Sequence, residues 1–215
     1  LIDSDLAGIE LRLFAHYLAR YDGGRYGKIL LEQDIHQVNA DKIGISRRQV
    51  KTITYCFLYG GGNQKLGLSY DNMLSPEAAK KKGAEIRRAY LDAVDGLEDL
   101  VEATKKVATR GSIRAIDKRQ ILVDKEHKAL NCLLQGSAAV IAKRWLLLTD
   151  AKLGNTTHER YAFVHDEQVL GAPAANAEYI AEVCKLSALE AGEYYNLRLP
   201  IEADAQIGDN WAQVH

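Results

Sequence analysis

Proline occurs only three times among the 215 residues, at Pro76, Pro173 and Pro200. Because proline breaks helices, the stretches between these positions can form long ones. Apolar residues recur at helical spacing over most of these stretches, while only short runs alternate as strands do. The chain is therefore predicted to be mainly helical, with a small amount of β-structure.

Seven segments carry helical periodicity or helix start signals. Ser46 and Ser75 are suitable N-cap residues, and Pro76 would occupy the first helical position after Ser75. The glycines at positions 60 to 62 would end the helix that starts at Ser46. The predicted helices span about residues 9–20, 34–42, 46–58, 75–92, 96–109, 125–152 and 176–194.

Strand-like runs occur near residues 1–5, within 112–123, and at 199–206. A further pair, Tyr161 to Val164 and Gln168 to Leu170, flanks a polar turn and predicts a β-hairpin. Many helices and one small antiparallel sheet make the predicted class α+β.

The composition is that of a globular domain, with 47% hydrophobic and 27% charged residues. No apolar run approaches the roughly 20 residues of a membrane span, so no membrane partner is expected. Residues 80–128 carry a net charge of about +4 and residues 150–215 about −7. A basic middle segment can follow nucleic-acid phosphates, although solvated helices also carry lysine runs.

The three cysteines, Cys56, Cys132 and Cys184, are widely spaced and have apolar neighbours. Their odd number disfavours a disulfide framework, and no zinc-binding spacing is present. We predict reduced thiols in the core, which is typical of a cytosolic protein.

Acidic residues lie at the ends of predicted strands. Asp3 and Asp5 are two residues apart, so both side chains face one side of an extended strand. Asp166 and Glu167 lie at the tip of the predicted hairpin. If strand and hairpin are neighbours in one sheet, Asp5 and Asp166 meet, and such carboxylates suit Mg²⁺. Two ions could then assist an in-line displacement, although acidic residues at turns are commonly only solvated.

Arg47, Lys51, Tyr55 and Tyr59 recur every four residues and therefore follow one helix face. The cations lie toward the helix N-terminus, where a triphosphate is stabilised, and the aromatics offer a stacking surface for a base. An amphipathic helix with a cationic edge and core tyrosines has the same spacing. The helix alone leaves both interpretations open.

These segments, taken in order, resemble the motifs of family A DNA polymerases, the group of bacterial DNA polymerase I. The similarity spans essentially the whole chain, and two segments, residues 52–60 and 207–211, resemble phage replicative members. The matching segments are motif A at Asp5 to His16, motif B at Arg47 to Gly60, motif C at Val164 to Glu167, and supporting matches at Asp34 to His36, Leu130 to Gln135 and Ile207 to Trp211.

The resemblance implies that Asp5, rather than Asp3, is the motif A metal ligand and that Asp166 is its partner. The backbone carbonyl of Leu6 would be a further ligand, and the cofactor would be two Mg²⁺ ions. Glu167 would lie near the primer end and belong to the catalytic group.

The resemblance also assigns the nucleotide contacts. Arg47 and Lys51 would bind the triphosphate, and Lys51 would protonate the leaving pyrophosphate. Tyr55 would stack on the incoming nucleotide, and His36 would contact the β-phosphate region. Glu10 would block a ribose 2′-OH, so deoxynucleotides would be preferred.

Four residues are implied to contact DNA. Tyr59 would lie beneath the templating base, while Asn131 and Gln135 would touch the template-primer near its terminus. His165 would approach the primer sugar-phosphate. From the sequence alone, a purely structural role is the better explanation of both His36 and His165.

A right-hand polymerase organisation follows from the resemblance, with palm at residues 1–34, fingers at 35–125 and palm at 126–215. The motif B helix would span about 46–58 and the motif C hairpin about 160–171. A start without Met inside a strand-like segment indicates a fragment without the thumb, and a processivity factor would bind the missing regions. Lys118 stands where phage relatives have glycine, which argues against a tight turn there.

The implied function is DNA-directed DNA polymerase activity in replication, by two-metal transfer of deoxynucleotides to a primer 3′-OH. The expected partners are primer-template DNA and deoxynucleoside triphosphates, in the cytoplasm of a bacterium or a phage-infected host. The alternative is a nucleotide- or DNA-binding fragment that is inactive without the thumb. RNA synthesis is disfavoured by Glu10 and by Glu167 following Asp166.

Overall fold

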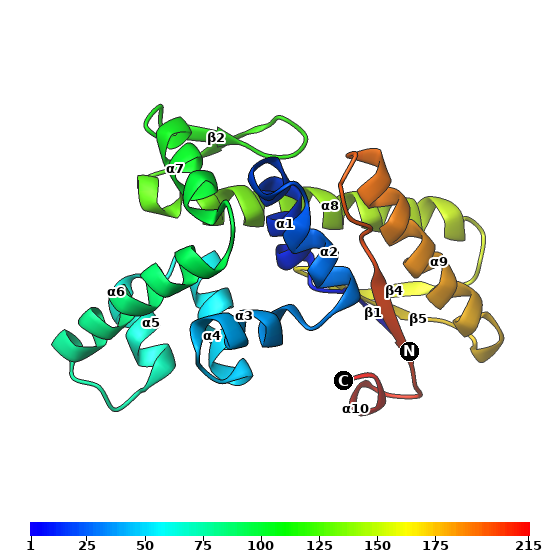
Figure 1. Cartoon of the computed structure of the whole chain (residues 1–215). Helices are drawn as coiled ribbons and strands as arrows, with labels where there is room; N and C mark the ends of the chain where they lie inside the picture. The colour runs from blue at the N-terminus through cyan, green and yellow to red at the C-terminus, as the bar shows by residue number, and fades with distance from the viewer. The chain divides into compact units, whose positions relative to one another are not determined.

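The computed structural model describes residues 1–215 and confirms the α+β class (Figure 1). The chain divides into two compact units, the first made of residues 1–13 and 136–215 and the second of residues 14–135. Their boundaries fall inside two helices, α1 (Ile9–Asp22) and α8 (Ala129–Leu153). None of the helices combines the length and the apolar character needed to cross a membrane.

The first unit is organised by a four-stranded antiparallel sheet with the order β4-β5-β1-β6. The helix α9 (Ala174–Tyr194) packs on β1 and β6, as Figure 1 shows, and buries Ile2 and Leu6 of β1. The strands are β1 (Ile2–Leu6), β4 (Glu159–Val164), β5 (Glu167–Gly171) and β6 (Ala203–Ile207).

Trp145 of α8 is the largest fully buried side chain of this unit. Its indole Nε1 donates a hydrogen bond of 2.8 Å to the backbone carbonyl of Cys184 in α9. This bond satisfies the one polar group of the indole and fixes α8 against α9. A short helix, α10 (Trp211–Val214), follows β6 and is anchored by the buried Val214.

The second unit consists of helices and one small hairpin. Figure 1 shows α5 alongside α6 and α3 alongside α4, and both pairs are in contact. The elements are α2 (Arg25–Glu32), α3 (Ile35–Ile43), α4 (Arg47–Leu58), α5 (Asn63–Tyr70), α6 (Pro76–Ala93), α7 (Leu97–Ala108), β2 (Ser112–Arg114), β3 (Gln120–Leu122) and the 3₁₀ turn η1 (Glu126–Lys128).

The predicted helix starts are confirmed. Ser46 and Gln49 form a reciprocal capping box at the start of α4, and the Ser75 hydroxyl accepts the Ala78 N–H at the start of α6. Both arrangements satisfy backbone donors that the first helical turn leaves unpaired.

Two predicted element starts were each four residues too early, while the other predicted bounds agree within two residues. The last strand begins at Ala203 rather than Leu199, because Pro200 has no N–H to donate and its carbonyl accepts from Arg12 Nη1 at 2.6 Å. The long helix begins at Ala129 rather than Lys125, since η1 occupies residues 126–128. Three helices were not predicted; α2 and α5 have eight residues each and α10 has four, too short for a clear period.

The expectation that Lys118 disfavours a tight turn was also wrong. Lys118 takes a φ of 70° between β2 and β3, and its N–H donates to the Ala115 carbonyl at 2.9 Å. The Ala115 N–H donates in turn to the Arg119 carbonyl at 3.0 Å. These bonds hold a lysine in a left-handed conformation that glycine adopts at lower cost.

All three cysteines are free, as predicted. Cys56 and Cys184 are buried, and Cys132 is half-buried. Burial raises the pKa of the Cys184 thiol to about 12, so it remains protonated at neutral pH.

The α5–α6 pair depends on two glycines. A Cβ at Gly83 would lie 1.7 Å from the Asn63 carbonyl oxygen, and one at Gly67 would lie 1.9 Å from the Ala79 carbonyl oxygen. Real Cβ atoms do not approach backbone so closely, so the two helices cross at a distance only glycine allows. This close crossing fixes α5, which follows the turn at the end of α4.

We predict that Gly83→Ala lowers the free energy of unfolding by about 2–4 kcal/mol, because the helices must separate to admit the methyl group. Gly62→Ala is the control, since a Cβ there has no atom within 4 Å and φ is −70°. The control should cost under about 1 kcal/mol, from the N-cap preference alone. Urea unfolding of both variants measures the difference, and equal losses would contradict the close-crossing explanation.

Candidate active site

Three carboxylates lie in one row across the sheet of the first unit. In the strand register Asp5 of β1 is opposite Glu167 of β5 on one side and Asp204 of β6 on the other. Directly paired residues of antiparallel strands project to the same face. Asp3, two residues before Asp5, faces the same side, opposite the face that α9 covers.

Asp166 joins this group from the turn between β4 and β5. The Leu6 N–H donates a 2.9 Å hydrogen bond to the Asp166 carbonyl, which fixes the turn beside the end of β1. His165, the other turn residue, has a φ of 56° and is exposed. The predicted meeting of Asp5 and Asp166 at neighbouring strand ends is therefore found in the fold.

The carboxylates repel one another. Desolvation raises the pKa of Asp166, and the charges of Glu10 and Asp5 raise it further. Desolvation also raises the pKa of Asp5, followed by the charges of Asp204 and Glu167. Both shifts disfavour the ionised form, and a bound cation would reverse that preference. Clustered carboxylate oxygens are the donors Mg²⁺ prefers, so the residues present fit that ion.

The residues that recur every four positions form a stripe along one face of α4 in the second unit, here called the α4 stripe. It consists of Arg47, Lys51, Tyr55 and Tyr59. Arg47, Lys51 and Tyr59 are exposed, and Tyr55 is half-buried. The Tyr55 and Tyr59 rings are stacked, with centroids 6.3 Å apart and planes inclined by 26°. The stripe thus presents two cations and then an aromatic surface, as its spacing predicted.

His36 lies beside this stripe. It is buried, and its ring centroid is 6.1 Å from that of Tyr55. Burial lowers the pKa of His36; Asp34 opposes this shift, and the cations Arg47 and Lys51 add to it. The imidazole is therefore neutral at pH 7, and its buried Nδ1 has no hydrogen-bond partner. The two cations near this neutral imidazole suit an anionic ligand.

Asp34 links the start of α3 to Arg47. Its Oδ1 accepts the backbone N–H groups of His36 at 3.0 Å and Gln37 at 3.2 Å, and its Oδ2 accepts from Arg47 Nε. The hydrogen bond from Arg47 is the main cause that lowers the pKa of Asp34. Asp34 therefore caps α3 and orients a residue of the stripe at the same time.

We predict that Asp34→Ala destabilises the protein by about 1 kcal/mol through loss of the α3 cap. Asp34→Asn keeps a capping side chain and removes only the negative charge that pairs with Arg47, so its stability should stay within about 0.5 kcal/mol of the wild type. Thermal unfolding of the two variants separates the functions. An equal loss in both would mean that the ion pair, not the cap, stabilises this helix.

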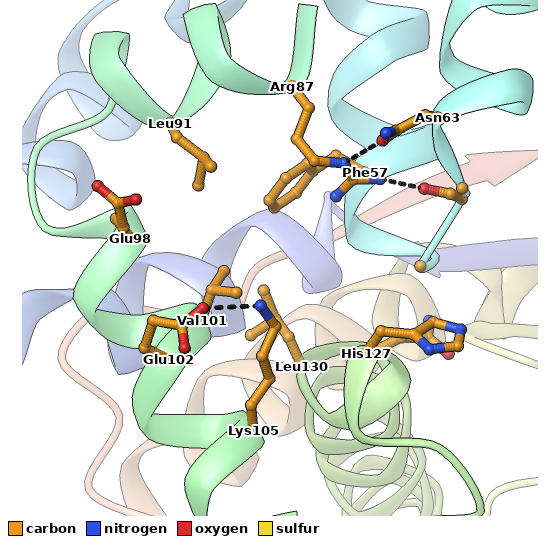
Figure 2. Close-up of a pocket in the computed structure, with 14 residues that line it drawn as sticks. Phe57, Asn63, Arg87, Leu91, Glu98, Val101, Glu102, Lys105, His127 and Leu130 are labelled. Carbon is orange, nitrogen blue, oxygen red and sulfur yellow. Dashed lines mark hydrogen bonds and ion pairs between the residues drawn. The ribbon is translucent and has the colours of Figure 1, made fainter. Parts of the chain in front are cut away.

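A pocket of about 390 Å³ lies within the second unit beside the turn that ends α4 (Figure 2). Figure 2 shows Arg87 crossing its upper wall, where Nε donates to Asn63 Oδ1 at 2.8 Å. Asn131 also lines the pocket and donates from Nδ2 to the Leu58 carbonyl at 3.2 Å. Gln135 lies one helical turn further along α8. The predicted DNA contacts Tyr59 and Asn131 thus belong to one part of this unit.

The sequence did not mark every residue of these clusters. Asp204 falls in a predicted strand, but no motif distinguishes it, and its place opposite Asp5 depends on strand register. Arg87 and His127 line the pocket, yet both belong to ordinary charged segments. No local signal identifies residues whose role depends on contacts between distant segments.

Comparison with known proteins decides the family. The family model described as DNA polymerase family A matches residues 1–213. The chain belongs to DNA polymerase family A. It is 33% identical to the DNA-directed DNA polymerase of Escherichia phage T7 over 98% of this chain, and 27% identical to DNA polymerase I of Bacillus caldotenax over 97%. The chain spans about a third of the phage relative and a quarter of the bacterial one.

Fold comparison agrees with this family A assignment. The polymerase domain of Pol1 from M. smegmatis, solved with DNA primer-template and dNTP, matches 99% of this chain with a TM-score of 0.80. The match covers 40% of that chain at 23% sequence identity, so it concerns the fold alone. The expected polymerase architecture of helices around a small antiparallel sheet is thereby confirmed.

Proposed function

We propose that this family A protein catalyses template-directed DNA synthesis, joining deoxynucleotides to a primer 3′-OH with release of pyrophosphate. The observation that carries the proposal is the pair of motif carboxylates, Asp5 and Asp166, held at neighbouring strand ends in a chain of this family. The names of its relatives, DNA-directed DNA polymerase and DNA polymerase I, support the same reaction.

Asp5, Asp166 and the backbone carbonyl of Leu6 would hold two Mg²⁺ ions. When bound, such ions make the attacking hydroxyl more nucleophilic and stabilise charge on the leaving oxygen. The two carboxylates contribute the negative charge that places the ions, and Glu167 adds to it near the primer end. Their mutual repulsion in the absence of a cation supports this assignment.

The α4 stripe would bind the incoming nucleotide. Arg47 and Lys51 neutralise the triphosphate, and Lys51 gives a proton to the pyrophosphate as it leaves. His36 contacts the β-phosphate region as a neutral donor, and Tyr55 stacks on the nucleotide. These side chains lie close to one another in the second unit, which supports a single phosphate-binding surface.

Glu10 would select the sugar by occupying the space that a ribose 2′-OH needs. It is half-buried, and its charge reaches Asp166. Primer extension with ribonucleotides would report this role, because Glu10→Ala should relax the preference for deoxynucleotides.

The template and primer would be contacted by Tyr59, Asn131, Gln135 and His165. The pocket beside the α4 turn supports template binding in the second unit, since Phe57 and Leu91 offer apolar surface for a base. Arg87 and Asn131 line the same pocket and supply polar groups. We assign the palm to residues 1–34 and 126–215 and the fingers to residues 35–125.

Primer extension with Mg²⁺ and deoxynucleotides tests the proposal, with templates of different sequence to show that the product follows the template. Binding of primer-template without nucleotide should be measured in parallel. Binding without any extension by folded protein would favour the alternative of a nucleotide- or DNA-binding fragment. We place the activity in the cytoplasm of a bacterium or phage-infected cell, since the relatives are phage and bacterial proteins.

A further inference from the structure

A second group of metal-binding side chains lies on the acidic face of the sheet and uses a residue that motif A leaves out. Asp3, Glu167 and His215 each offer one ligand atom, and these atoms all lie within 4.8 Å of one another. His215 Nε2 is 3.2 Å from Glu167 Oε1 and 4.0 Å from Asp3 Oδ2. The group combines two carboxylates with one imidazole.

The strand register builds the carboxylate half of this group. Asp3 pairs with Val169 and Asp5 with Glu167, so Asp3 and Glu167 occupy adjacent rows on one face. Pairs that are diagonal across antiparallel strands lie within reach of each other's side chains. Glu167 therefore lies beside both Asp5 and Asp3.

The imidazole is brought to the sheet by α10. The His215 N–H donates to the Trp211 carbonyl at 3.1 Å, and the two rings lie 4.1 Å apart with planes inclined by 34°. The buried Val214 holds α10 in place. The ring is thus held by a backbone hydrogen bond and a tilted ring contact, and its Nε2 lies near the two carboxylates.

An independent observation points to a missing ligand. Asp3 is only 6% exposed, and its Oδ1 is buried with no hydrogen-bond partner. A buried carboxylate oxygen without a partner costs the full desolvation of that atom. Nearly all such oxygens in folded proteins are satisfied by a donor, a water or an ion. The Asp3 carboxylate therefore has an oxygen, Oδ1, that the surrounding side chains leave without a partner, while its Oδ2 is the oxygen nearest to His215.

We propose that Asp3, Glu167 and His215 bind a divalent transition-metal ion of the Zn²⁺ type. Imidazole nitrogen favours Zn²⁺ over Mg²⁺, whose sites are built from oxygen. Zinc accepts nitrogen and carboxylate oxygen at about 2.0–2.2 Å, and catalytic-type sites use three protein ligands with one open position. Ligand atoms around such an ion lie about 3–4 Å apart by this geometry, close to the two separations that His215 makes here.

A bound ion would tie α10 to the central strands and withdraw charge from Glu167, a residue of the proposed catalytic group. The Zn²⁺ site is additional to the proposed DNA synthesis, because that function gives no role to two of its ligands, Asp3 and His215. Binding at this site needs neither DNA nor nucleotide.

Calorimetric titration with Zn²⁺ in millimolar Mg²⁺ tests the site, since Mg²⁺ occupies the all-oxygen ligands. We expect one Zn²⁺ per chain, with affinity lowered at least about tenfold in His215→Gln and in Asp3→Asn. His165→Gln is the matched control, since His165 is a second exposed histidine that lies two residues before Glu167 and near Asp166, and it should bind Zn²⁺ as the wild type does. Both ligand changes are near-isosteric, and circular dichroism confirms that each variant is folded.

Thermal unfolding gives a second readout, because an ion that binds only the folded state raises the unfolding temperature. Zn²⁺ should raise it in the wild type and in His165→Gln, and should raise it less in the two ligand variants at the same Zn²⁺ concentration. Absence of Zn²⁺ binding in the presence of Mg²⁺, or equal binding in all four proteins, would overturn the proposal and leave His215 as an ion-pair partner of Glu167. These measurements contain no primer, template or nucleotide, so their failure is distinct from failure of polymerase activity.

Discussion

Asp166→Asn is expected to abolish primer extension, with a loss of at least roughly 10³-fold, and at the same time to make the metal-free protein more stable. The amide cannot supply the negative charge needed to hold a divalent cation opposite Asp5. The substitution also removes a negative charge at position 166 that the carboxylates of Glu10 and Asp5 repel. We expect a gain of about 0.5–1 kcal/mol in the free energy of unfolding, which is about 1–4 °C for a domain of this size.

The pH dependence of the gain has a definite sign. The folded-state pKa of Asp166 is raised above its ordinary value of 3.8, so the wild type loses stability as pH rises through that window. Below pH 3.8 the Asp166 carboxyl is protonated in both the folded and the unfolded wild type. The charge of Asp166 then has no effect on folding, and wild type and Asp166→Asn should have the same free energy of unfolding. The difference should appear as pH rises from 3.8 and be complete above the folded-state pKa. Thermal unfolding in a chelator at several pH values measures this curve.

Asp204→Asn is the matched control for this experiment. Asp204 is opposite Asp5 in the same row, and its charge contributes to the raised pKa of Asp5. Its replacement should also stabilise the metal-free protein but should retain most of the primer extension, since it is not among the proposed ligands. Full activity in Asp166→Asn would reject Asp166 as a metal ligand, and a loss of stability there would reject the repulsion argument.

Lys51→Ala is expected to reduce kcat/KM for the incoming deoxynucleotide by about 10–100-fold. The estimate corresponds to one lost charge-assisted hydrogen bond to phosphate of about 1.5–3 kcal/mol. Because Lys51 is also proposed to donate a proton to pyrophosphate, kcat should fall as well as KM rise. Steady-state primer extension with varied nucleotide concentration separates the two parameters.

Arg48→Ala is the charge-matched control on the same helix. Arg48 is exposed, as Lys51 is, and lies about 60° around the helix from it, where it lines a separate pocket with Thr52 and the end of α5. Alanine favours helix at both positions, so α4 should remain folded in each variant. We expect less than about a threefold change for Arg48→Ala. Equal losses in the two variants would mean that general positive charge, rather than the stripe, attracts the nucleotide.

The sequence by itself determined most elements of this fold, because their signals are local. Ser46 and Ser75 mark helix starts through hydrogen bonds that span three residues, and the α4 stripe follows from a four-residue spacing. The hairpin between β4 and β5 follows from two apolar runs and a polar turn. Interactions that close within one turn of chain can be read without knowledge of the fold.

The candidate site was predicted only in part for the same physical reason. Motif resemblance selected Asp5, Asp166 and the α4 residues, and the structure gives the predicted places to the two carboxylates. The positions of Asp204 and His215 beside this group were not predicted. Both depend on how strands from opposite ends of the chain pair and on where a four-residue helix packs.

Tertiary structure alone decided the surroundings that set the chemistry of these groups. The α5–α6 crossing requires glycine at positions 67 and 83 because two backbones meet there, and neither glycine has a local turn to mark it. The burial of Asp3 and His36 is decided by what packs over them, since the exposure of a side chain depends on residues far away in the sequence. Local pattern determined which side chains are present, while strand register and packing decided which of them are charged, buried or neighbours.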